Sequence, residues 1–385
     1  MKNLKIALAA IIALFFFESA KCQDKNPTGQ SGSKVISTAT PFLTISPDAR
    51  GGSMGDAGVA SSPDAGSMYY NAAKYAFIED KAGLDISYTP WLRKLVNDIN
   101  LFYLSGYYRI DDMSTVAASL TYFSLGDIVF TSAGGIVNGT YRPAEFAFTL
   151  AYARKFTDHW SGSISFKYIN SNLTQGQADQ QNDSKAGNAV AADLGVYYQN
   201  DITLFNLPGE FAWGLQLSNM GNKISYSERN NDKYFLPANF RIGPRVSLDL
   251  DDYNRLSFMV DFNKLMVPTP DHSANPEDRY KYLASDISVV EGMLQSFYKA
   301  PGGFSEKISE VTTSFGVEYL YNNVFALRGG YFYESKDKGN RKYFTLGAGL
   351  KYNILDINFS YLIPQNQQNP LENTVRFSLV FNLPK

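Results

Sequence analysis

The chain has 385 residues, a formal net charge of −2 and 19% charged residues, so it lacks the basic excess that is typical of nucleic-acid-binding proteins. Its one cysteine and two histidines exclude an intrachain disulfide and are too few for a cysteine- or histidine-based metal site. We therefore expect no cofactor. The chain is rich in aromatic residues, with 26 tyrosines and 27 phenylalanines, yet its mean hydropathy is slightly negative, which is unusual for a soluble enzyme.

Residues 1–22 are typical of a cleaved export signal. Lys2 and Lys5 precede an apolar run over 6–17, which is shorter than the roughly 20 residues of a membrane-spanning helix. We expect cleavage after Cys22, which would leave no cysteine in the mature chain; lipidation of Cys22 is the alternative. Residues 23–40 are polar, and we expect them to form a flexible periplasmic tail.

Residues 41–82 are rich in small residues and have few large apolar side chains between Ile45 and Met68. Several glycines let the backbone turn sharply or approach another surface closely: Gly51, Gly52, Gly55, Gly58 and Gly66. Such a segment cannot build a core of its own. We therefore expect it to fill the interior of a barrel as a plug.

From residue 83 to 385, apolar and polar residues alternate with the period of a β-strand. The pattern recurs about fourteen times, for example over 116–122, 344–352 and 375–381, and bacterial outer-membrane barrels have an even number of strands. Together with the export signal, the alternation predicts an all-β membrane protein, an antiparallel transmembrane β-barrel in the lipid bilayer of the outer membrane. A secreted β-sandwich or propeller is the alternative.

The predicted connections alternate between short and long. Tight connections occur at 110–113, 157–159, 251–254 and 321–323, whereas long ones cover 124–143, 171–188, 219–237 and 263–310. This alternation is typical of outer-membrane barrels, which have short periplasmic turns and long extracellular loops, and it is not expected of a sandwich or propeller. One exception is 199–210, which should be short by this rule and is not.

One helix is predicted within the longest connection, over residues 276–299. Asn275 suits the N-cap, Pro276 suits the first helical position, and the run 300–303 ends the helix. By loop parity the helix lies outside the cell. Its apolar residues recur every three to four positions: Tyr280, Leu283, Ile287, Val290, Leu294 and Phe297. This face would cover the rim or plug of the barrel, or bind a partner protein.

Charged residues of both signs are predicted to point into the barrel. By strand alternation they are Arg241, Arg245, Arg328, Asp193, Asp249, Asp261 and Glu318. A lumen lined by both signs favours a salt-bridged seat for the plug over an ion filter.

A serine hydrolase is disfavoured, although Gly51 to Gly55 match the pattern G-x-S-x-G around Ser53. No strand is predicted before this serine, and His159 and His272 fall in connections on opposite sides of the membrane. The aspartates of 249–254 are better explained as a solvated turn than as a calcium site. We therefore expect no enzymatic activity.

The plug segment strongly resembles the start of the PorV family, the outer-membrane barrels of the type IX secretion system. The resemblance rests on TPFL at 40–43, ISPDAR at 45–50, MGDAGVA at 54–60 and SPDA at 62–65, and it continues to Lys74. Its structural motif contains Pro47, Asp48, Ala49, Arg50, Gly55, Asp56, Gly58, Asp64 and Asn71. More distantly, the segment resembles the hatch of the fourteen-stranded FadL fatty-acid transporters. Both families have Asn-Pro-Ala where this chain has Asn71-Ala72-Ala73.

The resemblance implies a non-enzymatic component of type IX protein secretion. Proteins of this family bind secreted cargo through its C-terminal signal domain and associate with the translocon barrel (SprA/Sov-like). They deliver cargo to the surface attachment machinery, whose protease (PorU-like) removes the signal.

Two alternatives remain open. A FadL-like transporter of hydrophobic small molecules would need an apolar pocket, which these plug residues could line: Phe42, Leu43, Ile45, Met54 and Met68. An outer-membrane acyl hydrolase would depend on Ser53.

Overall fold

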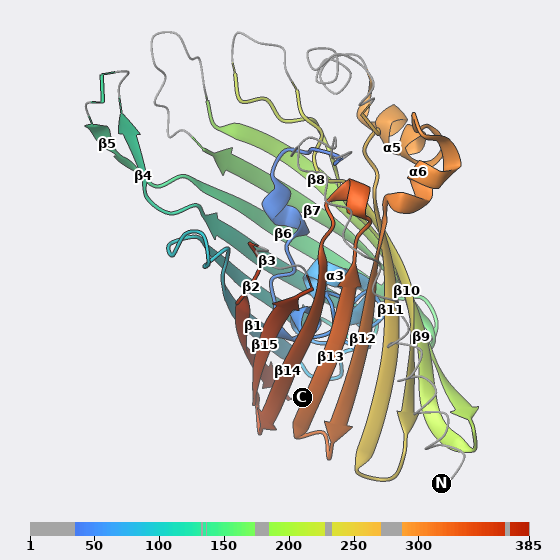
Figure 1. Ribbon diagram of the computed structural model, residues 1–385. Helices are drawn as coiled ribbons and strands as arrows, with labels where there is room; N and C mark the ends of the chain where they lie inside the picture. The colour runs from blue at the N-terminus through green and yellow to red at the C-terminus, as the bar shows by residue number, and fades with distance from the viewer. Residues whose placement is uncertain are drawn as a thin grey trace. The chain divides into compact units, whose positions relative to one another are not determined.

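Fourteen antiparallel strands close into a barrel in the computed structural model (Figure 1), which describes residues 35–131, 134–135, 137–173, 185–227, 233–270, 287–365 and 370–384. The last strand pairs with the first, from Ala82 opposite Leu383 to Tyr88 opposite Phe377. The predicted fourteen-stranded barrel is thereby confirmed. The barrel strands are β1 (Ala82–Pro90), β2 (Asn100–Arg109), β3 (Ser114–Ser124), β6 (Ala144–Lys155), β7 (Trp160–Asn172), β8 (Gly187–Leu204), β9 (Leu207–Gly221), β10 (Asn239–Asp249), β11 (Asn254–Leu265), β12 (Val311–Tyr321), β13 (Phe325–Tyr333), β14 (Lys342–Tyr352), β15 (Leu355–Pro364) and β16 (Val375–Leu383).

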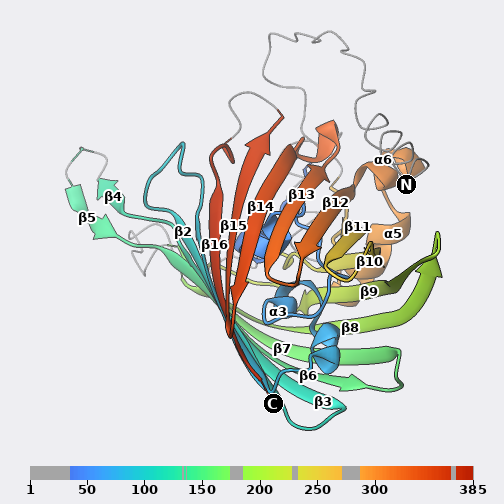
Figure 2. The same ribbon diagram turned by 90° about the horizontal axis from the view of Figure 1, so that it is seen from below.

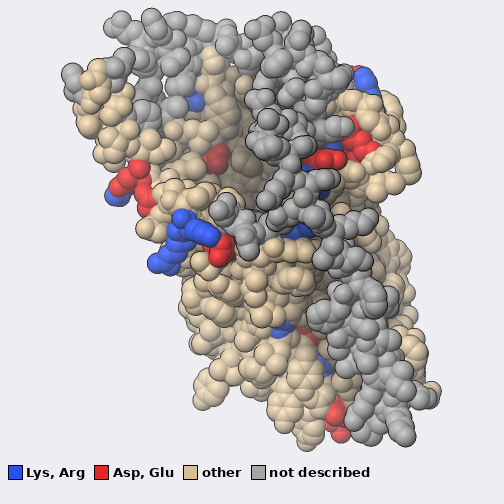
Figure 3. All heavy atoms as spheres, in the orientation of Figure 1, with Lys and Arg blue, Asp and Glu red and all other residues tan. Residues whose placement is uncertain are grey.

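Successive residues of each strand face opposite sides of the barrel wall. In β1, Ile86 and Tyr88 are exposed on the outside, whereas Asp85 and Ser87 are buried inside. The outer wall in Figure 3 is largely uncharged, as expected of a surface in contact with lipid. Among the described residues, no helix combines the length and the apolar content needed to cross a membrane.

The two ends of the barrel differ in their connections. At one end, which we call the turn end, the strands are joined by tight turns at 110–113, 156–159, 205–206, 250–253, 322–324 and 353–354. At the other, the loop end, the connections are long and carry the hairpin of β4 (Ile128–Thr131) and β5 (Val137–Tyr141), the helices α5 (Val289–Tyr298) and α6 (Gly303–Ser309), and the short η3 (Lys336–Lys338). Since outer-membrane barrels place short turns in the periplasm, we assign the loop end to the cell exterior.

The exception at 199–210 is resolved by the structure. This stretch is not a long loop, because β8 and β9 continue through it and only Phe205 and Asn206 form the turn. Both turn residues have positive φ, 55° and 63°, which fits a two-residue hairpin whose twist matches that of its strands. The short and long connections therefore alternate around the barrel without exception.

Residues 41–81 lie inside the barrel and form four short helical turns. These are η1 (Pro41–Thr44), α2 (Ala49–Gly52), α3 (Ser67–Tyr70) and η2 (Ala72–Phe77). Figure 2, seen from below, shows α3 surrounded by the strands. We call residues 41–81 the plug. Its alanines and glycines are almost completely buried, so small side chains let its backbone approach the wall closely.

The described part of the predicted tail, residues 35–40, lies at the loop end of the barrel. The Ala39 amide donates a hydrogen bond of 2.9 Å to the Phe235 carbonyl, in the long connection before β10. Ala39 and Phe42 belong to a buried apolar cluster with Phe123 and Leu236. The end of the predicted tail is therefore anchored at the loop end by an apolar contact that its polar composition did not indicate. The predicted signal peptide and Cys22 lie outside the described residues.

The predicted helix over 276–299 falls within the described residues only from Ile287 onward. Residues 271–286 lie outside the described part of the chain, and with them Tyr280 and Leu283. Ser288 is extended, and its Oγ accepts the Glu291 amide at 3.2 Å, so α5 begins at Val289 and cannot continue from an earlier helix. A second helix, α6, which the pattern did not predict, follows at Gly303.

Candidate functional site

Arg50 joins the plug to the barrel wall through a buried ion network. Its guanidinium donates to both carboxylate oxygens of Glu318 on β12, at 3.1 and 3.0 Å, and to Asp64 at 2.6 Å. Arg328 on β13 donates to the same Glu318 at 2.6 Å. Two guanidinium groups therefore balance two carboxylates, which is the arrangement that makes buried charge tolerable.

The surroundings of Asp48 and Asp64 in the plug shift their pKa values in opposite directions. Asp48 caps α2 by accepting the Gly51 amide at 2.8 Å, and burial together with nearby Asp64 raises the pKa of its carboxyl. Burial alone would raise the pKa of the Asp64 carboxyl. The neighbouring Arg50 guanidinium outweighs burial, so the pKa lies below its ordinary value. Asp64 is therefore ionised as a partner of Arg50.

Asp261 on β11 holds the plug by its backbone. One carboxylate oxygen accepts the amides of Gly58 and Val59, at 2.8 and 2.9 Å. Gly58 is needed here because a Cβ at this position would lie 2.4 Å from the ring of Tyr70. This contact leaves no room for a side chain at Gly58.

Other motif residues contact strands around the rest of the wall. The Asn71 amide group donates to the Val196 carbonyl on β8 at 2.9 Å, and its Oδ1 caps η2 by accepting the Ala73 amide at 3.1 Å. The local turn therefore forms without the proline of Asn-Pro-Ala. Four further contacts join the plug to the wall: Pro47 with Thr89, Ala49 with Ser378, Gly55 with Thr345, and Asp56 with Tyr343.

The seven charged residues predicted to face inward divide into two groups. Four contact the plug directly, and Arg328 does so through Glu318: Arg241 stacks over Tyr69 and Tyr70, Arg245 donates to the Ala60 carbonyl, and Asp261 and Glu318 bind as described above. The other two pair with the wall, Asp193 with Lys167 at 3.1 Å and Asp249 with Arg255 at 2.5 Å. The seat of the plug is therefore ionic on the side of β10 to β13.

Lys74 is a buried cation of the plug, and it predicts a pH dependence of stability. Its ammonium donates to the Gly58 carbonyl at 2.9 Å and to Ser61 at 2.8 Å, and burial lowers its pKa from 10.5 to about 8. Below pH 8 both the folded and the unfolded chain carry this proton, and the folded state bears the full cost of burying the charge. Between about pH 8 and 10.5 only the unfolded chain keeps the proton, so the free energy of unfolding rises with pH, by about 3 kcal/mol in all.

The measurement compares wild type with Lys74→Met in detergent by chemical unfolding at several pH values. The stability of wild type relative to Lys74→Met should increase between pH 8 and 10.5 and stay level below pH 8. If the free energies of unfolding of the two proteins changed with pH in parallel, the lowered pKa of Lys74 would be contradicted.

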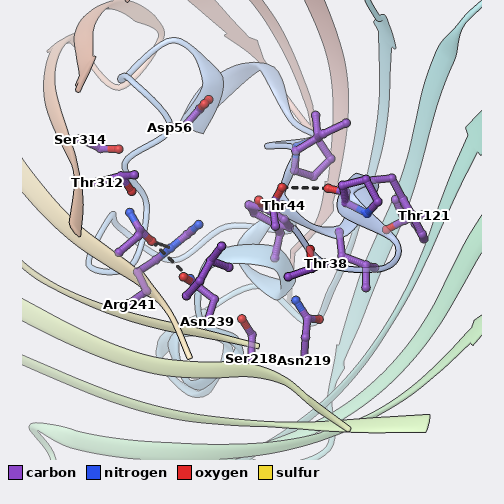
Figure 4. A pocket seen from close by; sticks show the side chains of 18 of the residues that line it. Thr38, Thr44, Asp56, Thr121, Ser218, Asn219, Asn239, Arg241, Thr312 and Ser314 are labelled. Atoms are coloured by element: carbon purple, nitrogen blue, oxygen red, sulfur yellow. Dashed lines mark hydrogen bonds between the residues drawn. The ribbon is translucent and has the colours of Figure 1, made fainter. Parts of the chain in front are cut away.

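A cavity of about 560 Å³ lies between the plug and the loop end (Figure 4). Hydroxyl and amide groups from both sides point into it, including Thr38 and Thr44 from the N-terminal segment and Asn219, Asn239 and Thr312 from the wall. Phe42, Leu43, Ile45 and Met68 also line the cavity, whereas Met54 lies apart from it against Met259. The cavity is therefore of mixed polarity, with an apolar part at Phe42, Leu43, Ile45 and Met68.

The helices α5 and α6 have an inverted arrangement of polar and apolar residues. The side buried against the barrel carries Gly292, Gln295 and Ser296 in α5, and Glu306 and Lys307 in α6. The large apolar side chains are exposed by 46 to 80%: Val290, Leu294, Phe297, Tyr298, Phe304 and Ile308. We call these six residues the rim patch.

Fixed contacts hold the rim patch at the edge of the barrel. Lys338 of η3 donates to Glu306 at 2.8 Å and to Glu310 at 3.2 Å, and Lys264 of β11 donates to Glu310 at 2.5 Å. The ring of Phe297 lies edge-on to Phe240 of β10, with centroids 5.9 Å apart. The patch is therefore presented on a supported surface.

The rim patch contains only part of the predicted helical face. Val290, Leu294 and Phe297 belong to it, Ile287 precedes the cap and is half-buried, and Tyr280 and Leu283 lie outside the described residues. The prediction missed Tyr298, Phe304 and Ile308. The spacing of Phe304 and Ile308, four residues apart, was the signal for a second short helix.

The hydrolase hypothesis finds no support in the geometry. Ser53 is fully buried and donates to the Arg50 carbonyl at 2.6 Å, and it follows a helical turn where a nucleophile elbow needs a strand. His159 lies on an exposed turn at the turn end, and His272 lies outside the described residues. Within the described ranges, no group of three or more His, Cys, Asp or Glu residues could hold a metal ion.

Comparison with known families connects this structure to a secretion system. A family model for the type IX secretion system protein PorV matches residues 28–272. The chain belongs to the PorV family. Membership of the PorV family confirms the resemblance of the plug segment, and it identifies the chain as an outer-membrane barrel of type IX secretion.

The solved structures similar to this PorV-family chain include several FadL-like channels. The TodX deltaS2S3 mutant monoaromatic hydrocarbon channel is 14% identical, with a TM-score of 0.48 over 88% of this chain and 99% of that one. The Pseudomonas putida toluene transporter TodX is 13% identical, with a TM-score of 0.43 over 86% and 96%. A Pseudomonas aeruginosa FadL homologue is 12% identical, with a TM-score of 0.41 over 91% and 99%. No curated protein matches the chain.

Proposed function

We propose that this protein is a non-enzymatic subunit of type IX secretion that handles cargo on the outer surface of the membrane. In this proposal it binds the C-terminal signal domain of secreted proteins, associates with the translocon barrel and passes cargo to the surface attachment protease. Its exported form would arise by removal of residues 1–22. The single observation that supports the proposal is the rim patch, six large apolar side chains exposed at the loop end.

The closed lumen argues that proteins are handled outside the barrel and not passed through it. The plug is tied to the wall by Arg50, Asp261 and Asn71, with contacts on β8, β11 and β12. A folded cargo domain could not pass without breaking these buried bonds, each of which is costly to leave unmade. The working surface of the protein is therefore at an end of the barrel.

The rim patch fits a protein partner at the loop end. Leaving apolar surface in water costs roughly 25 cal/mol per Å², and exposed apolar patches typically mark interaction sites. In α5 and α6 the apolar side chains are exposed while polar ones are buried, so the barrel itself does not cover the apolar surface. The translocon barrel, which shares the membrane plane with this protein, is the partner that we assign to the patch.

A FadL-like transporter is the second candidate, favoured by the apolar part of the cavity lining at Phe42, Leu43, Ile45 and Met68. It predicts lipid or detergent bound in the purified barrel and loss of hydrocarbon uptake on deletion. The secretion proposal predicts instead that deletion leaves cargo inside the cell with its signal domain attached. Normal secretion in the deletion strain would rule out the secretion proposal.

The double substitution Leu294→Glu and Phe304→Glu tests the rim patch. Both side chains are exposed, by 61 and 80%, so the folded barrel should keep its stability within about 0.5 kcal/mol. Copurification of the translocon barrel should fall by roughly tenfold or more, since buried aromatic anchors at interfaces typically contribute over about 2 kcal/mol.

The matched control is Leu95→Glu with Val137→Glu, at loop-end residues that are exposed by 63 and 62% but lie outside the patch. The control should secrete and copurify like wild type. Equal behaviour of the two double variants would refute the role of the rim patch.

A further inference from the structure

The hairpin of β8 and β9 extends beyond the neighbouring turn at 156–159, which joins β6 to β7. β7 accompanies β8 as far as the pair Trp160 and Tyr198, and the last backbone contact runs from the Gln199 amide to the His159 carbonyl at 3.0 Å. Residues 200–204 continue beyond this point, which corresponds to about 17 Å of strand. In Figures 1 and 2 the tip of this hairpin stands apart from the neighbouring turns.

The outer edge of β8 is open along this extension. Leu204 and Leu207 flank the two-residue turn, so hydrogen bonds to β9 are made by residues 204, 202 and 200. The amide and carbonyl groups of Asp201 and Thr203 therefore face away from β9, where the described part of the chain provides no strand. An open edge of this kind is a template for pairing with another chain.

Two exposed aspartates lie on the side of the open edge: Asp201 on β8 itself, and Asp158 in the turn that joins β6 to β7. A groove of about 410 Å³ runs beside the strand, lined by Asp201, Ile202, Thr203, Pro208, Gly209, Glu210, Asp249 and Arg255. Glu210 and Asp249 already pair with Arg245 and Arg255, whereas Asp201 has no ion pair among the described residues. Asp201 therefore provides an unpaired carboxylate on the strand that has the open edge.

We propose that the β8–β9 hairpin docks an extended, basic segment of a periplasmic protein, which adds to the open edge of β8 as a further strand. The backbone of the segment would bond to Asp201 and Thr203, and its basic side chains would reach the Asp201 carboxylate. The exposed tip at Leu204 and Phe205 gives the segment an apolar contact. This site lies at the opposite end from the rim patch and does not depend on the proposed function.

A lipid surface fits the hairpin less well than a strand does. The phenyl ring of Phe205 is 77% exposed and could enter a membrane interface, but lipid provides no partner for backbone amides. The carboxylates of Asp158 and Asp201 also favour a positively charged partner over anionic lipid headgroups. Both the charge of the site and its free backbone groups therefore favour a basic extended segment over a lipid surface.

The test uses the full-length protein in detergent and a fluorescent peptide of alternating lysine and valine as the probe. We expect saturable binding with a Kd below about 1 mM by fluorescence anisotropy. Thr203→Pro should weaken binding by roughly tenfold or more, because proline lacks the N–H that faces the open edge. This substitution removes no hydrogen bond between β8 and β9, so the hairpin should persist.

Two matched variants separate backbone from charge. Thr203→Ala keeps the edge amide and should bind the peptide like wild type. Asp201→Asn should weaken binding and reduce its dependence on salt concentration. A peptide of alternating glutamate and valine should not bind.

Four outcomes would overturn the proposal. They are no binding of the lysine peptide at about 1 mM, unchanged binding by Thr203→Pro, equal binding of the glutamate peptide, and membrane insertion of the tip without peptide binding. The last is measured with Phe205→Trp in nanodiscs, where quenching of tryptophan fluorescence by brominated phospholipid beyond that of wild type, which has three tryptophans, would report contact of the tip with lipid.

Discussion

Replacing Arg50 by methionine is expected to lower the free energy of unfolding by about 3 kcal/mol, because it leaves the carboxylate of Asp64, which is 26% exposed, without its partner. Arg50 now serves both Asp64 and Glu318, and the second of these is only 2% exposed. Arg328 can neutralise Glu318 but not Asp64 as well. The plug should therefore loosen, and the variant should show ion conductance in planar bilayers above that of wild type.

The control for Arg50 is Arg255→Met, which breaks the half-exposed pair with Asp249 at the turn end. Exposed pairs contribute at most about 1 kcal/mol, so this variant should be nearly as stable as wild type. Adding Asp64→Asn to Arg50→Met should recover most of the lost stability, since it restores the charge balance. An Arg50→Met barrel that unfolds and conducts like wild type would contradict the ionic seat.

Replacing Gly330 by alanine is expected to displace the plug from β13. A Cβ at Gly330 would lie 2.1 Å from the backbone nitrogen of Gly55 and 2.1 Å from the Met54 carbonyl carbon, which is closer than any contact can be. Gly55 has a φ of 67° and cannot easily yield, so the plug backbone must shift as a whole. We expect a loss of about 1–3 kcal/mol, typical of overpacking, together with increased proteolysis of the plug in detergent.

The neighbouring Gly329 provides a matched control on the same strand. A Cβ there would meet nothing closer than 3.8 Å, so Gly329→Ala should match wild type in both measurements. If the two alanine variants behave alike, the close approach of plug and wall at β13 is not what holds the plug.

The barrel itself could be predicted from the sequence because its signal is local and repeated. Alternation in strands such as β14, with Phe344 and Leu346 outside and Tyr343 and Thr345 inside, reflects a pleat that every strand shares. The alternation of short and long connections between the strands followed from the same pattern. The resemblance of the plug segment, confirmed by the PorV family model, added the secretion system that alternation could not show.

Contacts between the plug and the wall could not be predicted residue by residue. Arg50 and Glu318 are 268 residues apart, and nothing in a strand pattern says which inward carboxylate an arginine in the plug will reach. The helix break at Ser288 could not be predicted either, since its Oγ caps α5 within a stretch whose apolar spacing continues through it, and Asn275 lies outside the described residues. Half of the rim patch, Val290, Leu294 and Phe297, lies on the predicted helical face. Whether the barrel covers that face could not be predicted, because an amphipathic pattern does not say which face is covered.

The sidedness of the barrel is the claim on which the functional account depends, and cysteine labelling tests it most directly. Phe304 is 80% exposed in α6 at the loop end, and Phe205 is 77% exposed at the turn end. With a membrane-impermeant maleimide, Phe304→Cys should label in intact cells, whereas Phe205→Cys should label only after the outer membrane is permeabilised. Labelling of Phe205→Cys but not Phe304→Cys in intact cells would place the rim patch in the periplasm and contradict the account.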